Sequence, residues 1–271
     1  MTASSAQAQN LFVSDAQTGT VYEYTPNGMG STFASGLNSP SGLAFNSAGD
    51  LFQSDWASGN IYKYTPGGAR STFASGLEGP LGLAFDSEGN LFAAASGSGN
   101  IYEFTPGGVQ STFATGLVFP VALAFNAAGD LFATDNGIGN IDEFTPGGMQ
   151  STFASGLTSS VGLAFNSMGN LFEADEIGGT IYEFTPGGMQ STFASGLNIP
   201  SGLLFSSAGD LFEADIGSGN IYHFTPNGTR TTFASGLSQP AFLAFQPVPE
   251  PSALGLLAVG ATALLVRRRR C

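Results

Sequence analysis

Residues 51–90 read LFQSDWASGN IYKYTPGGAR STFASGLEGP LGLAFDSEGN, and this stretch decides the fold because the chain repeats it. The dipeptide Leu-Phe returns six times at a spacing of 40 residues, without insertion or deletion, at positions 11, 51, 91, 131, 171 and 211. An internal period of this length is the signature of a repeat architecture. A motif copied six times also argues against catalysis, because catalysis needs several different groups converging on one point.

Each repeat contains four short segments with the composition of β-strands. In the second unit they are residues 42–46, 51–54, 60–65 and 70–74, and Gly, Pro, Asn and Asp separate them. Short runs rich in apolar, aromatic and β-branched residues, bounded by such breakers, are typical of strands joined by tight turns. No segment of 10 or more residues before the C-terminal tail shows the period of a helix, which argues against helical repeats.

Four antiparallel strands in each 40-residue unit predict an all-β fold, a six-bladed β-propeller over residues 11–247. The chain starts inside a blade at Leu11 and ends with an orphan first strand at residues 240–246. We therefore expect one blade to be built from both chain ends, which removes exposed sheet edges. Deletion of residues 240–246 should unfold the ring. A parallel β-helix is the alternative fold, although its coils are usually shorter.

The stretch from Pro80 to Phe92 resembles the NHL repeat. It has a Pro-x-Gly start before an apolar strand, an Asp-x-x-Gly-Asn turn and a second apolar strand, and all six units over residues 11–246 match this pattern. The resemblance implies the scaffold of the six-bladed propellers that include the gluconolactonase and strictosidine-synthase-like proteins. It does not select one function among them.

Composition excludes several kinds of chemistry. Residues 1–248 hold three basic against 19 acidic residues, a formal charge of −16, which should repel nucleic acid and anionic membranes. Cys271 and His223 are the only residues of their types. A disulfide framework or a cysteine zinc site needs more than one cysteine, and Ser-His-Asp or Cys-His catalysis would have to use His223 alone. His223 occupies a position that carries Glu or Lys in other units, which predicts a half-exposed strand residue.

The resemblance also allows a test for an enzyme site. Gluconolactonase-like enzymes bind a divalent metal at the channel mouth through Glu, Asn and Asp, several of them just before the innermost strands. The corresponding positions here contain no carboxylate or carboxamide: Ser41, Leu81, Val121, Val161, Ser201 and Ala241. Hard cations need such oxygen ligands. Streptogramin-lyase-like propellers use a histidine base, and His223 does not fit that arrangement. We therefore expect no catalytic residue, no metal, no cofactor and no enzyme.

An aspartate follows the Leu-Phe strand in every unit but one. The residues are Asp15, Asp55, Asp135, Asp175 and Asp215, with Ala95 in the third unit. A ring of carboxylates could bind a cation. We favour a structural role, in which each Asp accepts backbone N–H groups and holds its loop, since the loss at position 95 would break a metal ring but only loosen one loop.

The repeats differ most in two loops that should emerge on the same face of the ring. Large apolar residues in these loops predict a recognition surface, although relaxed drift between recent duplicates is the alternative. The candidate binding residues are Trp56, Val118, Phe119, Ile138, Ile177, Ile199 and Ile216.

The C-terminal tail, residues 248–271, has a different composition. Pro249-Glu250-Pro251 precedes an apolar run from Ala253 to Val266, and the basic cluster follows as Arg267, Arg268, Arg269 and Arg270. This order resembles the PEP-CTERM sorting signal of Gram-negative bacteria. The resemblance implies a short hydrophobic helix, recognition and removal by an exosortase, and export. A permanent membrane anchor is the alternative, although 14 residues are few for a span of about 17 to 25.

The N-terminal residues 1–10 lack the apolar core of an export signal, although Ala6-Gln-Ala8 resembles a cleavage site. We interpret this segment as the remnant of a signal whose beginning precedes the assigned start.

Together these features predict an exported propeller, anchored transiently in the inner membrane by its tail and then placed in the cell envelope or outside the cell. We expect a non-catalytic binding or structural module of the cell surface or extracellular matrix, with an exosortase as processing partner and a polysaccharide or surface protein as ligand. A divergent lactonase-like or lyase-like enzyme and a passive structural protein are the alternatives.

Overall fold

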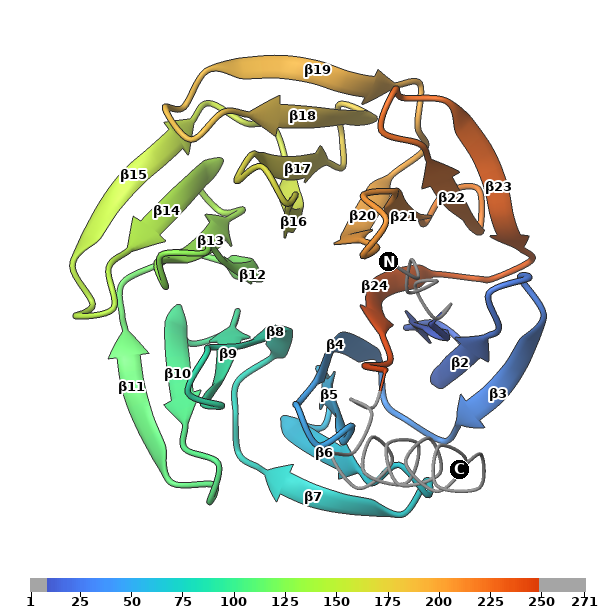
Figure 1. Cartoon of the computed structure of the whole chain (residues 1–271). Helices are drawn as coiled ribbons and strands as arrows, with labels where there is room; N and C mark the ends of the chain where they lie inside the picture. The colour runs from blue at the N-terminus through green and yellow to red at the C-terminus, as the bar shows by residue number, and fades with distance from the viewer. Residues whose placement is uncertain (1–8, 249–271) are drawn as a thin grey trace, which may run out of the picture.

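The computed structural model describes residues 9–248, which form 24 β-strands and no helix. Six four-stranded antiparallel sheets stand around a central axis as the blades of a propeller (Figure 1). This confirms the predicted six-bladed fold and excludes the parallel β-helix. The hydrophobic helix expected in the tail, and the expected signal remnant up to residue 8, lie outside the described residues.

The four strands of each blade follow one another from the channel outward. Blade 1 contains β24 (Pro240–Phe245), β1 (Leu11–Asp15), β2 (Thr20–Tyr24) and β3 (Gly30–Ala34). Blade 2 contains β4 (Pro40–Phe45), β5 (Leu51–Asp55), β6 (Asn60–Tyr64) and β7 (Arg70–Ala74). Blade 3 contains β8 (Pro80–Phe85), β9 (Leu91–Ala95), β10 (Asn100–Phe104) and β11 (Gln110–Ala114). Blade 4 contains β12 (Pro120–Phe125), β13 (Leu131–Asp135), β14 (Asn140–Phe144) and β15 (Gln150–Ser155). Blade 5 contains β16 (Ser160–Phe165), β17 (Leu171–Asp175), β18 (Thr180–Phe184) and β19 (Gln190–Ser195). Blade 6 contains β20 (Pro200–Phe205), β21 (Leu211–Asp215), β22 (Asn220–Phe224) and β23 (Arg230–Ser235).

Blade 1 closes the ring by joining the two ends of the chain, as the sequence predicts. Strand β24 pairs antiparallel with β1, with Leu11 opposite Phe245 and Val13 opposite Leu243. The N–H of Gln246 donates to the carbonyl of Asn10 at 3.0 Å. Because β1 would otherwise be an exposed inner edge of its sheet, this pairing removes a template for aggregation.

The second strand of each blade is buried on both sides, which explains its unbroken apolar run. Phe52 on β5 contacts Phe73 of its own blade and Phe85 of the next, with ring centroids 4.9 and 5.1 Å apart in edge-to-face geometry. The same cluster recurs at every blade interface, ending with Phe212 against Phe245 at 5.3 Å. Each such pair contributes about 0.5–1.5 kcal/mol beyond its buried area. The aromatic positions of the repeat therefore hold neighbouring blades together.

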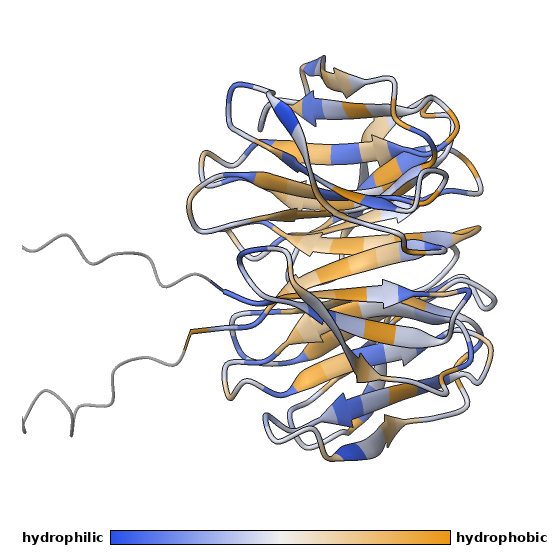
Figure 2. Cartoon of the chain, turned by 90° about the vertical axis from the view of Figure 1, so that its right-hand side faces the viewer, coloured by the Kyte–Doolittle hydropathy of each residue, from blue (hydrophilic) through white to orange (hydrophobic). Residues whose placement is uncertain are grey.

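The ring has two faces that differ in what they carry. We call the side with the inner turns, such as residues 46–50, the turn face; both described chain ends lie there, on the left of Figure 2. The opposite side, the loop face, carries the loops after the second and fourth strands, such as residues 56–59 and 75–79. These two loops are adjacent, since the N–H of Leu77 donates to the carbonyl of Gly59 at 3.0 Å.

Candidate functional site

The predicted binding residues lie in the loops of the loop face. Trp56, Val118, Phe119, Ile138, Ile177 and Ile199 are exposed, whereas Ile216 is half-buried. They cover an arc from blade 2 to blade 6, and the loops next to blade 1 carry polar residues such as Asn38 and Gln239 instead. The structure thus places these residues on one face. Whether this face binds a ligand remains a prediction.

The recurring aspartates hold the loops of this face in place. Asp135 accepts the backbone N–H groups of Val118 and Phe119 at 2.8 and 2.9 Å. Asp55 accepts from Ser58 at 3.2 Å and from Asn38 at 2.7 Å, so one carboxylate ties its own loop to the preceding one. Both oxygens of these carboxylates are occupied by amide donors. This geometry supports the structural interpretation and disfavours a ring of cation ligands.

The third unit shows how the loop is held where the aspartate is missing. Ala95 leaves room for a different contact, in which the Ser96 hydroxyl donates to the carbonyl of Gly79 at 2.9 Å. The indole Nε1–H of Trp56 donates to the same hydroxyl at 3.3 Å. Trp56 is thereby fixed against the next blade, with its ring still partly exposed.

The six positions just before the innermost strands carry no carboxylate or carboxamide side chain. Four of them are apolar and two are serines: Leu81, Val121, Val161, Ala241, Ser41 and Ser201. Val121 and Val161 belong to one buried apolar cluster, and Leu81 and Phe242 pack against it. The innermost strands also approach closely, since a Cβ on Gly42 would lie 2.2 Å from the carbonyl oxygen of Leu81. Within residues 9–248 no three His, Cys, Asp or Glu side chains are grouped as a metal site would require.

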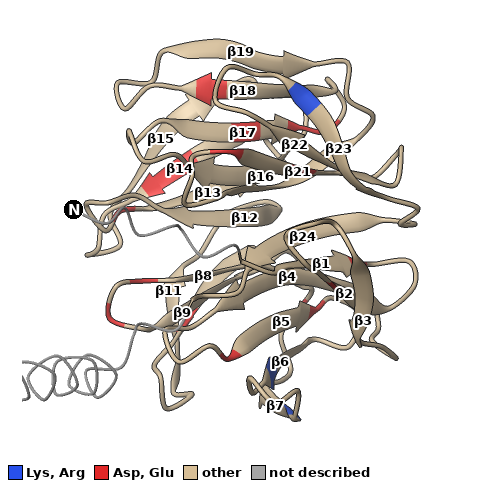
Figure 3. Cartoon of the chain, turned by 45° about the vertical axis from the view of Figure 1, so that its right-hand side comes forward, with Lys and Arg blue, Asp and Glu red and all other residues tan. Residues whose placement is uncertain are grey.

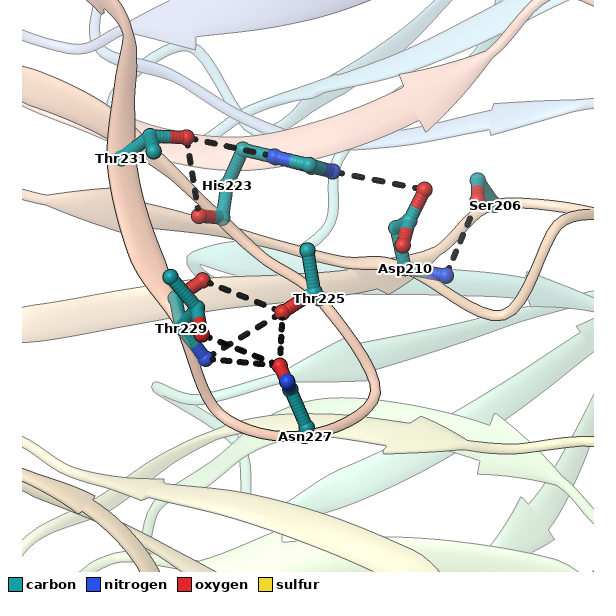
Figure 4. A network of polar contacts seen from close by, with 7 residues as sticks. All are labelled: Ser206, Asp210, His223, Thr225, Asn227, Thr229 and Thr231. Carbon is teal, nitrogen blue, oxygen red and sulfur yellow. Dashed lines mark hydrogen bonds and ion pairs between the residues drawn. The ribbon is translucent and has the colours of Figure 1, made fainter.

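His223 lies on β22, two strands away from the channel-lining β20. Its Nε2 is 3.3 Å from a carboxylate oxygen of Asp210, and its Nδ1 is 3.3 Å from the hydroxyl of Thr231 (Figure 4). Lys63 and Asp50 form the equivalent ion pair in blade 2 at 2.8 Å. His223 is therefore a partly exposed strand residue with a structural partner, as predicted, and is not placed to act on a substrate in the channel.

Two buried carboxyl groups were not anticipated from the sequence. Glu173 on β17 and Glu213 on β21 are fully buried between blades, and in the described part of the chain neither has a hydrogen-bond partner for its carboxyl oxygens. Burial raises the pKa of Glu173 to about 8, although the nearby Ser160 hydroxyl lowers this pKa and Asp175 raises it further. Burial raises the pKa of Glu213 to about 9, with a further contribution from Asp215. The sequence did contain one indication of their burial, because each glutamate is the third residue of a short strand whose other positions are apolar or small.

The buried glutamates do not form a catalytic pair. Glu173 faces blade 4 and Glu213 faces blade 5, because alternate residues of their strands pack on opposite blade neighbours. Asp142, which replaces the tyrosine of the other units, is also buried, and burial raises its pKa while Thr152 donates to it at 3.2 Å. These acids belong to the blade interfaces and not to either face.

Comparison with known proteins identifies the tail and the fold. Residues 247–270 match the PEP-CTERM protein-sorting motif, which confirms the interpretation of the C-terminal segment. A search of curated protein sequences found no significant match. Among residues 9–248 the structure contains no helix with the length and apolar character that a membrane crossing requires.

Solved structures show that several kinds of protein share this ring. A chain of a nidogen/laminin complex superposes with a TM-score of 0.81 at 18% identity, over 89% of this chain and 99% of that chain. Virginiamycin B lyase from Staphylococcus aureus gives 0.70 at 16% identity, over 88% and 86%. A structural-genomics target provisionally assigned as a gluconolactonase gives 0.70 at 18% identity, over 78% and 82%. At these identities the similarity establishes the six-bladed fold alone, and that fold occurs in binding proteins and in enzymes.

Proposed function

We propose that this protein is an exported, non-catalytic binding module that presents its loop face to a polysaccharide or a surface protein of the extracellular matrix. The PEP-CTERM motif implies export and processing by an exosortase, with transient anchoring through the tail. The observation that carries the binding role is the arc of exposed apolar side chains on the face opposite the chain ends.

The position of the tail orients the ring. The last described residue, Val248, follows β24 on the turn face. Only residues 249–252 separate it from the apolar run that starts at Ala253, and the five steps from Val248 to Ala253 span at most about 18 Å. While the tail is in the membrane, the turn face must therefore lie near the bilayer. The loop face then points outward, where a ligand can reach it.

The apolar arc is typical of a recognition surface. Trp56 and Phe119 are large and rigid, and aromatic side chains of this kind often dominate binding energy. The loops that carry them are held by carboxylate and hydroxyl contacts, so little ordering is required on binding. The channel positions of the described chain also support a non-catalytic role, because four of the six are apolar, two are serines, and none carries a carboxylate, carboxamide or histidine.

A thermal-shift experiment tests this function. Residues 9–248, which contain every strand of the ring, would be heated with matrix polysaccharides, with surface proteins and with small lactones. A ligand that binds only the folded state raises the melting temperature. We expect a rise with a polysaccharide or surface protein that Trp56→Ala with Phe119→Ala abolishes. Turnover of a lactone would instead support the enzyme alternative.

A further inference from the structure

The loop face contains a hollow of about 470 Å³ between blades 5 and 6. Its lining combines a carboxylate and an amide with aliphatic side chains: Glu176, Ile177, Gly178, Gly179, Leu197, Asn198 and Ile199. We call this the Glu176 hollow. It deepens the proposed function, on which it rests, because it gives one part of the loop face a definite chemistry.

The walls of the Glu176 hollow are aliphatic. Ile177 is 73% exposed and Ile199 is 39% exposed, so both offer apolar surface to solvent, and the buried Leu197 lies beneath them. The side chain of Asn198 packs over Gly217, whose missing Cβ leaves the necessary space. Aliphatic walls of this kind would cover the stem of a long side chain.

The only charged group that lines the hollow, among the described residues, is the Glu176 carboxylate, which accepts hydrogen bonds. Oε2 of Glu176 accepts from the Ser159 hydroxyl at 3.1 Å, and Oε1 has no hydrogen-bond partner among the described residues. Within residues 9–248 no Lys or Arg lines the hollow. Arg230 reaches the carbonyl of Gly196 at 3.4 Å and stacks on Tyr222, and neither it nor Tyr222 lines the hollow. Acidic segments outnumber basic ones on the ribbon of the ring (Figure 3). A cationic group is therefore the complementary partner for this carboxylate.

The backbone conformation at Ile199 determines how its side chain lies beside the hollow. Its φ is +63°, in the left-handed region that a β-branched residue rarely adopts. Gly79 takes the same φ at the equivalent position of the third unit, where it carries no such strain. Ser39 has a φ of 66° at the equivalent position before β4, so the loop geometry sets this conformation, and at position 199 it holds an exposed isoleucine beside the hollow.

We propose that the Glu176 hollow binds an arginine side chain of a partner polypeptide. The apolar stem would lie against Ile177, Leu197 and Ile199, and the guanidinium would reach the oxygens of Glu176 and Asn198. A planar guanidinium has five N–H donors spread over three nitrogens, so it can bond a carboxylate and a second, separate acceptor better than the compact ammonium of lysine. The charge of −16 on residues 1–248 would also attract a basic partner.

The test uses two blocked tripeptides, Ala-Arg-Ala and Ala-citrulline-Ala, which differ only in charge. Binding to the full chain in phosphatidylcholine nanodiscs would be measured by saturation-transfer NMR at 0.15 M salt, with empty nanodiscs subtracted. We expect the arginine peptide to bind at least about tenfold more tightly than the citrulline peptide, as loss of a charged hydrogen bond predicts. Equal binding of the two peptides would overturn the proposal.

Three variants locate the binding. Glu176→Gln keeps an acceptor for Ser159 and should weaken the arginine peptide about tenfold. Ile199→Gly should weaken it similarly while raising the melting temperature, so a loss of binding cannot come from unfolding. Ser39→Gly is the matched control, because Ser39 also has a positive φ of 66° but lies in the polar loops next to blade 1, away from the hollow. This variant should leave binding unchanged.

Undiminished binding in Glu176→Gln and Ile199→Gly would show general attraction to an acidic protein and would overturn the proposal. Competition for the hollow by a polysaccharide would also overturn it, but would leave the proposed function intact. The proposed function itself fails on a different result, namely that Trp56→Ala with Phe119→Ala changes the binding of no matrix component.

Discussion

Replacement of the buried glutamates by glutamine should stabilise the protein in a pH-dependent manner. Glu173 lies between Leu163 and Tyr182 on the neighbouring strands and has no hydrogen-bond partner for either carboxyl oxygen among the described residues. Burial raises its pKa from 4.5 to about 8, so the carboxyl is neutral in the folded protein at pH 7 and ionised in the unfolded chain. Glu213 behaves alike, with a pKa of about 9.

The sign and size follow from linkage. Below pH 4.5 both states are protonated and the carboxyl costs no stability. As pH rises from 4.5 toward the folded-state pKa, the unfolded state alone ionises, and stability falls by about 1.4 kcal/mol per pH unit. At pH 7 the loss is about 3 kcal/mol for each glutamate, and at pH 5 it is under about 1 kcal/mol.

Glu173→Gln should therefore stabilise the ring by about 2.5 kcal/mol more at pH 7 than at pH 5, or about 5–10 °C in melting temperature. Urea denaturation of residues 9–248 at the two pH values measures this difference; pH 4 is avoided because it lies close to the sequence pI of about 4.1. The difference between pH values cancels any change that is independent of ionisation. A Glu213→Gln variant should behave in the same way.

Gln53 offers the reverse experiment, because it occupies the same strand position in blade 2 and donates to the carbonyl of Ser54. Gln53→Glu should lose stability as pH rises from 5 to 7. If Glu173→Gln stabilised the protein equally at both pH values, the carboxyl would not be neutral in the fold, and the reasoning would be refuted.

Three further predictions concern the loops and the ring. Asp135→Ala should destabilise the protein by about 3 kcal/mol, measured by urea denaturation, because two backbone N–H groups lose a charged acceptor. An added divalent cation should not change the stability of the native protein. A rise in stability with the cation would instead support a ring of metal ligands. Phe245→Ala should cost about 2–3 kcal/mol by chemical denaturation, since the half-buried Phe245 packs on Phe212 where the ring closes, and a loss below about 1 kcal/mol would show that closure does not depend on this contact. Ile199→Gly should raise unfolding free energy by about 1–3 kcal/mol by releasing left-handed strain, with Ser39→Gly as the comparison, and a decrease would mean that the Ile199 side chain stabilises the fold.

Much of the architecture could be predicted from the sequence because each unit is locally consistent. Turn residues, strand composition and the period of 40 residues recur in every unit, so the number of blades follows from counting. The orphan strand at residues 240–246 predicted closure, and the structure pairs it with β1. The order of motif, apolar run and arginines predicted the sorting tail, which the match over residues 247–270 confirms.

The functional face could be predicted only as a set of loops. Repeat alignment shows that Ile177 and Ile199 vary, but they belong to different loops 22 residues apart in the sequence. That they share one hollow with Glu176 depends on how neighbouring blades meet, and the same is true of the strain at Ile199. The structure also shows which oxygens of Asp55 and Asp135 are already occupied, which composition could only suggest.

The sequence by itself determined the repeat, the number of blades, the closure of the ring by both chain ends and the sorting signal in the tail, because all four follow from the order of residues along the chain. The tertiary structure alone decided where the charges and apolar groups meet: a neutral Glu173 between blades, an apolar cluster around Val121 and Val161, and the Glu176 hollow on the loop face. These depend on distances between residues of different units, and a periodic sequence carries no information about which of its copies will face one another until the ring closes.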